Sequence, residues 1–143
     1  MEKLIMTSSK VSNELFGHGN CLLCGSRNPL SLGLRFEERE SGVLHAEFQG
    51  NPALQGYSGI LHGGVISSLL DSAMTHSLFH RGIKALTGEL TVRFFRSVPC
   101  DALLNIRSWV KTSTPPLFYV EAELSWAGEL MAMAKAKFMK SDI

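Results

Sequence analysis

The feature that most constrains the fold is one stretch of helical periodicity in a chain whose other apolar residues mostly alternate with polar ones. Between Gly64 and Arg81, apolar residues recur three or four positions apart, which predicts an amphipathic helix about 27 Å long. Gly82 is a natural end for this helix. Its apolar positions are Val65, Ile66, Leu69, Leu70, Ala73, Met74 and Leu78.

The segments on both sides of the helix alternate between apolar and polar residues, as half-buried strands do. Matching the apolar faces of the last two segments pairs Leu124 with Ala132 and leaves a three-residue loop at 127–129. Met131 and Met133 then lie opposite the core face, where they would line an interface or an adaptable acyl site, or simply pack. Strands are expected within 30–38, 42–48, 85–98, 102–112, 117–126 and 129–140, with a loop over 49–64.

These elements predict an α+β fold in which an antiparallel sheet wraps around one long central helix. Such a unit leaves the edges of its sheet unpaired, so we expect it to dimerise with a second copy. Residues 1–20 are interpreted as a peripheral N-terminal segment with a short helix near 11–16. Residues 21–143 are interpreted as a single domain, because the chain is too short for two ordinary ones.

Charge and cysteine content limit the classes of function. Lys and Arg number 14 against 13 Asp and Glu, so no broad basic field is available for nucleic acid or an anionic membrane. The first residues lack the apolar core of a signal peptide, and no stretch reaches the about 18 unbroken apolar residues of a spanning helix. The three cysteines argue against a disulfide framework. We therefore expect a cytoplasmic protein with no nucleic-acid or membrane partner.

The helix is expected to begin with His62-Gly63-Gly64 instead of the usual Ser, Thr, Asp or Asn cap. Without such a cap, backbone N–H groups of the first turn would stay unclaimed, and glycine would let a ligand approach them closely. Free amides at a helix start suit a phosphate or a developing oxyanion. The plain alternative is a tight turn that only glycine can make.

Asp71 lies on the polar face of the predicted helix, among the small hydroxyl residues Ser67, Ser68 and Thr75. A solvated carboxylate is the plain alternative, but a face that is polar without Lys or Glu fits a crevice or a subunit contact better. Gly64 and Asp71 would be about 10 Å apart along the axis, too far to act on one carbonyl. If both act, two antiparallel helices from two subunits must supply them.

Residues 55–74, QGYSGILHGGVISSLLDSAM, and residues 86–99, LTGELTVRFFRSVP, together resemble the hotdog-fold acyl-CoA thioesterases of the PaaI-like branch. The His-Gly-Gly, the Asp nine residues after the His, and a strand that begins with Thr and ends in Arg-x-x-Pro all match in order and spacing. The early CLLCGSRNPLSLGLRF is also similar to the lead-in of some members. The likeness covers roughly residues 20–140.

This resemblance implies a hotdog homodimer, often paired into a homotetramer, that hydrolyses the thioester of an acyl-CoA without a further cofactor. It implies that the Gly64 N–H polarises the thioester carbonyl. It also implies that Asp71 of the partner subunit acts as nucleophile or as general base, and these two roles stay open. His62 would shape the loop, and Thr87 would orient the attacking water.

The predicted substrate-binding residues are Gly63, Gln55, Arg93 and Arg96. Many relatives carry Asn or Gln six residues before the motif His, where this chain has Gly56, so Gln55 is the nearest candidate for that role. Arg93 and Arg96 would meet the phosphates of CoA, since a near-neutral protein needs local cations to bind a polyanion. Solvated charges at strand ends are the plain alternative for each arginine.

Two other functions remain open. A hotdog hydratase or dehydratase would act on related thioesters, but the predicted helix shows no His at the place where such enzymes are expected to carry one. A non-catalytic dimer that binds acyl-CoA would keep the helix start and would have no need of Asp71.

Neither of two metal-binding patterns is complete in the sequence. Cys21-x-x-Cys24 is a single pair with His18 nearby, whereas a structural zinc site normally has four ligands. We therefore favour a loop with buried thiols and expect no metal. His76 and His80 lie one helical turn apart without a visible third ligand, and we interpret them as packed or hydrogen-bonded histidines.

Overall fold

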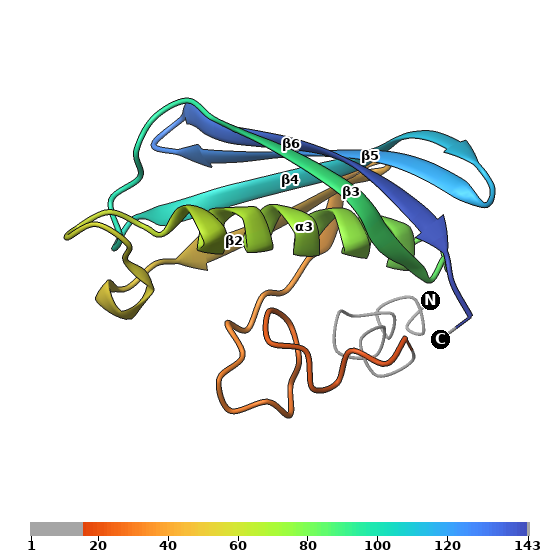
Figure 1. The fold of residues 1–143 in the computed structure, drawn as a ribbon, viewed down its shortest axis with the longest axis horizontal. Helices are drawn as coiled ribbons and strands as arrows, with labels where there is room; N and C mark the ends of the chain where they lie inside the picture. Colours follow the sequence, from red (N-terminus) through yellow and green to blue (C-terminus); the bar gives the residue numbers. More distant parts are fainter. Residues whose placement is uncertain (1–15, 143) are drawn as a thin grey trace.

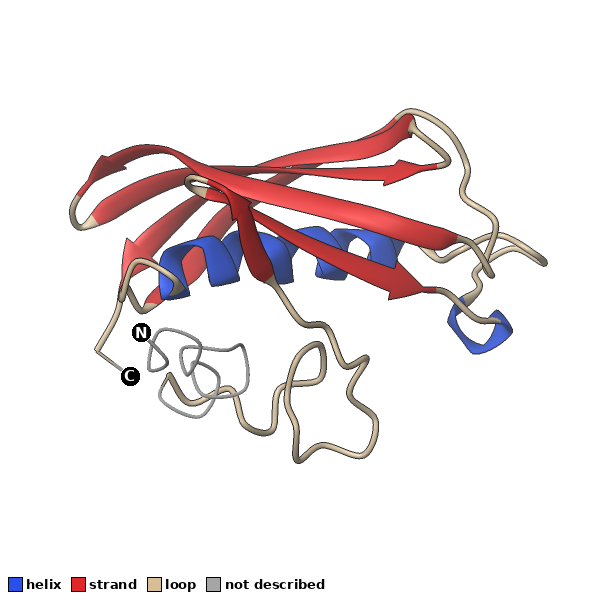
Figure 2. Cartoon of the chain, turned by 180° about the vertical axis from the view of Figure 1, so that it is seen from behind, coloured by secondary structure: helices blue, strands red, loops and turns tan. Residues whose placement is uncertain are grey.

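A computed structural model describes residues 16–142 of the chain. Six strands form one antiparallel sheet in the order β1-β2-β4-β5-β6-β3, and the sheet curves over the long helix α3 (Figures 1 and 2). The predicted α+β architecture with one long helix is confirmed. The elements are β1 (Glu37–Glu40), β2 (Val43–Gln49), the 3-10 turn η1 (Pro52–Leu54), α3 (Gly63–Phe79), β3 (Ala85–Phe94), β4 (Leu103–Thr114), β5 (Leu117–Trp126) and β6 (Glu129–Lys140).

Helix α3 forms because its apolar residues repeat at helical spacing and pack onto the concave face of the sheet. Its buried residues include every predicted core position except Val65, which is partly buried. The helix begins one residue before the predicted Gly64 and ends two residues before Arg81. A buried polar link also joins it to β4, because the Ser108 hydroxyl donates to the Ala73 carbonyl at 2.7 Å. None of the helices in residues 16–142 could span a lipid bilayer.

The β5–β6 hairpin keeps the predicted pairing of Leu124 with Ala132, but its loop is shorter than expected. Trp126 lies opposite Glu129, so only Ala127 and Gly128 form the turn, and both have positive φ, 52° and 80°. This is the backbone geometry of the tightest hairpin turns.

A bulge restores the predicted register after this short turn. Ser125 lies opposite Leu130 and Leu124 opposite Ala132, which leaves Met131 as the extra residue of β6. Met131 is buried, so the expectation that it lies opposite the core face is wrong. Met133 is partly buried.

The first predicted strand, 30–38, is largely wrong. Only Glu37–Glu40 forms a strand, and residues 30–36 run as an irregular segment in which Leu34 and Phe36 are buried. The alternation in this stretch reflects side chains that turn alternately into the core. The N–H groups of Leu32 and Leu34 donate to the carbonyls of Leu22 and Leu23, but these residues form no strand of the sheet. The second predicted strand, 42–48, corresponds to β2.

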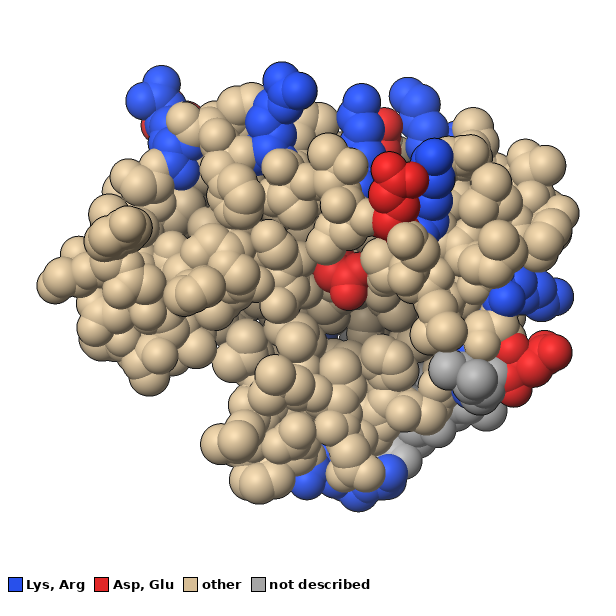
Figure 3. Space-filling model, viewed as in Figure 1, with Lys and Arg blue, Asp and Glu red and all other residues tan. Residues whose placement is uncertain are grey.

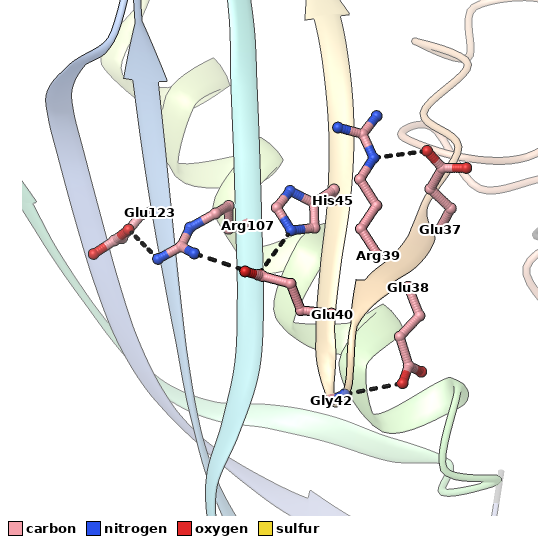
Figure 4. Close-up of polar contacts among 8 residues, drawn as sticks. All are labelled: Glu37, Glu38, Arg39, Glu40, Gly42, His45, Arg107 and Glu123. Carbon is pink, nitrogen blue, oxygen red and sulfur yellow. Dashed lines mark hydrogen bonds and ion pairs between the residues drawn. The ribbon is translucent and has the colours of Figure 1, made fainter.

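Charged side chains connect four neighbouring strands (Figure 4). Arg107 on β4 lies 3.0 Å from a Glu123 oxygen on β5 and 3.7 Å from a Glu40 oxygen on β1. His45 on β2 lies 3.2 Å from the same Glu40 oxygen. All four groups are at least partly solvent-exposed, so we attribute only a modest stabilisation to these contacts.

Residues 16–36 lie on the side of α3 away from the sheet, as both views in Figures 1 and 2 show. Phe16 stacks on Phe79 near the end of the helix, with ring centroids 4.7 Å apart. The short helix expected near residues 11–16 falls almost entirely outside the described residues. The division into a peripheral segment 1–20 and a domain 21–143 stays a prediction.

Candidate active site

The start of α3 is capped by a histidine side chain. His62 has extended backbone angles, and its Nδ1 accepts the N–H of Gly64 at 2.8 Å. The expectation that the Gly64 N–H is free is therefore wrong, because the His62 imidazole caps the helix in place of the usual Ser or Asp side chain. The N–H of Gly63 has no hydrogen-bond partner among residues 16–142. The Gly63 N–H is thus the donor that remains available at the start of α3.

A cleft of about 630 Å³ opens beside this amide. A side chain at position 63 would place its Cβ 3.7 Å from the Phe94 ring, which is ordinary contact, so the backbone here has space around it. Sequence reasoning missed Ile66 and Phe94 as parts of this site, although the two phenylalanines in the strand after the helix were a signal. The lining includes Ile60, His62, Gly63, Ile66, Phe94 and Arg96.

Asp71 lies two turns further along α3 and is only partly exposed. The Thr87 hydroxyl on β3 donates to its Oδ1 at 2.6 Å, so the structure brings these two predicted residues together. Thr87 is the third residue of β3, not its first. Burial raises the pKa of Asp71, and the Thr87 hydrogen bond opposes that rise. Smaller electrostatic effects come from Cys21, which raises this pKa, and from His18, which lowers it.

The small hydroxyl residues around Asp71 turn back onto the helix. Ser68 Oγ donates to the Gly64 carbonyl at 2.8 Å, and Thr75 Oγ1 donates to the Asp71 carbonyl at 3.0 Å. Both hydroxyl groups donate to backbone carbonyls of α3 itself, so they are turned away from the surface around Asp71. In Figure 3, which has the view of Figure 1, Lys and Arg gather along the sheet, while the surface over α3 is largely uncharged.

Gly63 and Asp71 do not converge within one chain. They are eight residues apart in α3, which corresponds to about 12 Å along the axis. A donor to an oxyanion and a base or nucleophile must both reach the same carbonyl to about 3 Å. One chain therefore presents two halves of a site at different points along its helix.

Of the other predicted binding residues, Gln55 is placed elsewhere. Its side-chain oxygen accepts the Gly59 N–H at 2.7 Å, which holds the loop, and the cleft is lined by Gly56 instead. Arg96 does line the cleft, with its Nε 2.7 Å from Glu129. Arg93 is exposed on β3 and is not among the residues that line the cleft.

The two histidines at the end of the helix are packed or hydrogen-bonded, as expected. His76 is fully buried against Phe36, and burial lowers its pKa to about 3. His80 Nδ1 lies 3.1 Å from the His76 carbonyl.

The fold and the geometry of this site define the class of protein. One long helix against a six-stranded antiparallel sheet is the hotdog fold. The model of the thioesterase superfamily matches residues 58–134, more than half of the chain, and the chain belongs to that superfamily.

Sequence similarity to a known protein supports this assignment. The bovine (Bos taurus) acyl-coenzyme A thioesterase THEM4 is 38% identical over 61 residues, which cover 43% of this chain and 24% of THEM4. The chain therefore spans only about a quarter of the length of that relative.

Among solved structures, the E. coli PaaI protein matches with a TM-score of 0.72 and 18% identity, over 78% of this chain and 81% of PaaI. A hypothetical thioesterase from Streptococcus pneumoniae TIGR4, solved with coenzyme A, matches with a TM-score of 0.71 and 15% identity. That match covers 76% of this chain and 85% of the other. At these identities the two structures support the fold alone.

Proposed function

We propose that the chain hydrolyses the thioester of an acyl-CoA to the free acid and CoA, at sites built by two subunits. The observation that carries this proposal is the pair of half-sites on α3. One is the Gly63 N–H, which has no partner within residues 16–142 and lies beside a largely apolar cleft, and the other is a partly buried Asp71 held by Thr87. The name of the THEM4 relative and the coenzyme A with which the streptococcal protein was solved support the same substrate class.

In this mechanism the Gly63 N–H, at the positive end of the α3 dipole, donates to the thioester oxygen as negative charge develops on it. This replaces Gly64 in the role that the sequence suggested, because the Gly64 N–H is already bound to His62. His62 then acts as a positioning residue: its ring closes the cap and fixes the first turn. Gly63 would also contact the substrate, as expected from the sequence.

Asp71 of the partner subunit would complete the reaction. As a general base it takes a proton from water while the water oxygen bonds to the acyl carbon. As a nucleophile it forms an anhydride that water then opens. Either way the C–S bond breaks, the sulfur leaves with a proton as the CoA thiol, and no cofactor takes part. Thr87 orients the carboxylate by its hydrogen bond.

The unpaired edge of β3 supports dimerisation. Within the described sheet β3 pairs only with β6, so its other edge offers unused backbone groups to a second copy. Exposed apolar side chains gather along the same strand: Leu86 is 50%, Leu90 37% and Phe94 50% exposed. We propose an antiparallel homodimer that can pair further into a homotetramer. In this dimer the α3 start of each subunit meets Asp71 of the other, and Arg93 and Arg96 lie near the CoA phosphates.

Incubation with a panel of short, long and aromatic acyl-CoAs is expected to release free thiol that a thiol reagent detects. Pocket shape would then determine which acyl group is cleaved fastest. Tight binding of acyl-CoA with no thiol release over hours would contradict the proposal and favour a binding protein. Loss of enoyl-CoA absorbance without free thiol would instead indicate a hydratase.

Thr87→Ala is expected to move the acidic limb of the pH–rate profile to higher pH. The Thr87 hydrogen bond opposes the raised pKa of Asp71, so its removal lets that pKa rise further, and the carboxylate form needs a higher pH. The profile of kcat/KM against pH measures the shift. Thr87→Ser is the matched control, because it keeps the hydroxyl group, and its acidic limb should match that of the wild type. An unchanged limb in Thr87→Ala would mean that Thr87 does not act on the reactive carboxylate.

A further inference from the structure

A second cluster of reactive side chains lies outside the proposed site, in the segment that packs under α3. His18, Cys21 and Cys24 converge there, and their ligand atoms all lie within 4.8 Å of one another. Cys24 is buried and the other two are partly buried. The Cys24 Sγ is 3.5 Å from the His18 Nδ1. All three cysteines of the chain fall within the described residues, and none forms a disulfide.

This spacing fits a tetrahedral metal ion. With Zn–S and Zn–N bonds of about 2.3 and 2.05 Å, a sulfur and a nitrogen on neighbouring corners of a tetrahedron lie about 3.6 Å apart. The distance of 3.5 Å between Cys24 and His18 is close to that value before any adjustment of the loop. Thiolate and imidazole are the ligands that zinc takes in structural sites.

The loop around the cysteines has a fixed and compact geometry. The Leu23 N–H points at the Cys21 Sγ at 3.3 Å, and the Gly25 N–H donates to the Cys21 carbonyl at 2.8 Å. A Cβ at position 25 would clash with the Cys21 nitrogen and would lie 2.6 Å from the Gly19 carbonyl oxygen, both backbone atoms. Only glycine fits there, so the Cys-x-x-Cys-Gly sequence closes a turn that holds both sulfurs on one side. Backbone hydrogen bonds to sulfur are also the kind of support that orients metal ligands.

The cluster lies against a buried histidine with unsatisfied polar atoms. The His76 ring is perpendicular to the His18 ring, with centroids 6.4 Å apart. His76 is fully buried, and neither of its ring nitrogens has a hydrogen-bond partner among the described residues. Buried polar atoms without partners are uncommon and call for a ligand, water or ion nearby. The cluster and His76 together therefore form a polar site inside an otherwise apolar contact between the segment and the helix.

We propose that His18, Cys21 and Cys24 bind a zinc ion that fixes the turn 18–25 against the end of α3, with the fourth position taken by water. The sequence alone favoured no metal, because one Cys pair with a nearby His falls short of the four ligands of a structural zinc site. The fold brings these three side chains together. Neither Gly63 nor Asp71 belongs to the cluster, so zinc binding can be measured separately from thioester hydrolysis.

Metal analysis of the purified protein is expected to find about one zinc ion per chain after exhaustive dialysis against metal-free buffer. Replacement by Co²⁺ should give the visible absorption of tetrahedral cobalt with thiolate ligands. Removal of the metal with a chelator should lower the thermal midpoint, and zinc should restore it. Wild-type protein that holds no zinc and gives no cobalt absorption, or that holds iron or copper instead, would overturn the proposal.

Cys21→Ser and Cys24→Ser are expected to reduce the bound zinc to background and to remove the cobalt absorption. Cys100→Ser is the matched control, because Cys100 is also a buried thiol but lies outside the cluster, and it should bind zinc as the wild type does. Equal zinc content in Cys21→Ser and wild type, or equal loss in Cys100→Ser, would contradict the ligand assignment. The measurements on wild-type protein decide the question even if a serine variant fails to fold.

Discussion

Asp71→Asn is expected to lower kcat for acyl-CoA hydrolysis by about 10²–10⁴-fold, the range that a positioned proton-transfer group contributes. The amide keeps the shape of the side chain and can still accept the Thr87 hydrogen bond, but it is neither a base nor an effective nucleophile. Thiol release under saturating substrate measures the change. Asp101→Asn is the matched control, because Asp101 is an exposed carboxylate in the turn before β4, and its replacement should leave kcat unchanged.

The same variant is expected to be more stable than the wild type at neutral pH. Burial raises the pKa of Asp71, so the ionised form is less favourable in the folded protein than in the unfolded chain. Wild-type stability therefore falls as the pH rises through the folded-state pKa, whereas an asparagine does not titrate. The thermal midpoint of Asp71→Asn should exceed that of the wild type at neutral pH, and the difference should shrink as the pH falls through that pKa.

Opposite effects on rate and stability would identify Asp71 as a group kept for function at the expense of the fold. A variant that hydrolyses acyl-CoAs as fast as the wild type would remove Asp71 from the mechanism. A variant that is inactive and also less stable at neutral pH would instead point to a structural role.

The periodicity of the sequence was sufficient to predict the helix and most of the sheet. β5 and β6 have the predicted bounds because each alternates along most of its length and packs one face on the core. The errors lie where the chain departs from a regular period. The turn at Ala127 and Gly128 depends on positive φ at both residues, and the bulge at Met131 follows from that turn. Hydrophobic pattern alone contains neither piece of information.

The candidate site was predictable to a similar extent. Spacing along one helix identified Asp71 and the glycines, and it showed that they cannot act on one carbonyl within a single chain. The choice between Gly63 and Gly64 depended on the orientation of the His62 ring, a side-chain torsion that no sequence pattern specifies. The same reason applies to His18, Cys21 and Cys24, since their convergence depends on a turn closed by Gly25.

Gly63→Pro is expected to lower kcat by about 10²–10³-fold, because it removes the one N–H that the helix start leaves available to an oxyanion. Proline is well tolerated at the first position of a helix, where Gly63 lies. His62, with φ −61° and ψ 132°, already has the backbone conformation that a residue before proline requires. Gly63→Ala is the matched control, because it keeps the N–H and adds a Cβ for which there is space.

The comparison that matters is between these two variants at equal folded content, checked by circular dichroism. Alanine should retain most of the wild-type kcat, and proline should not. Equal activity of the two would mean that the Gly63 N–H is not the oxyanion donor. Equal and complete loss in both would mean that the added bulk at position 63 blocks the cleft, and the donor assignment would lose its support.

Co-expression of the two inactive variants, Gly63→Pro and Asp71→Asn, tests whether one site uses both subunits. In a mixed dimer one site carries both defects, while the other combines an intact Gly63 from one subunit with an intact Asp71 from its partner. Random assembly of equal amounts makes half of the dimers mixed, so activity should return to about a quarter of the wild-type value. If each chain held a complete site, every site would carry one defect and mixing would restore nothing. Recovery from two inactive parents therefore requires that the helix start of one subunit and the carboxylate of the other act on the same thioester.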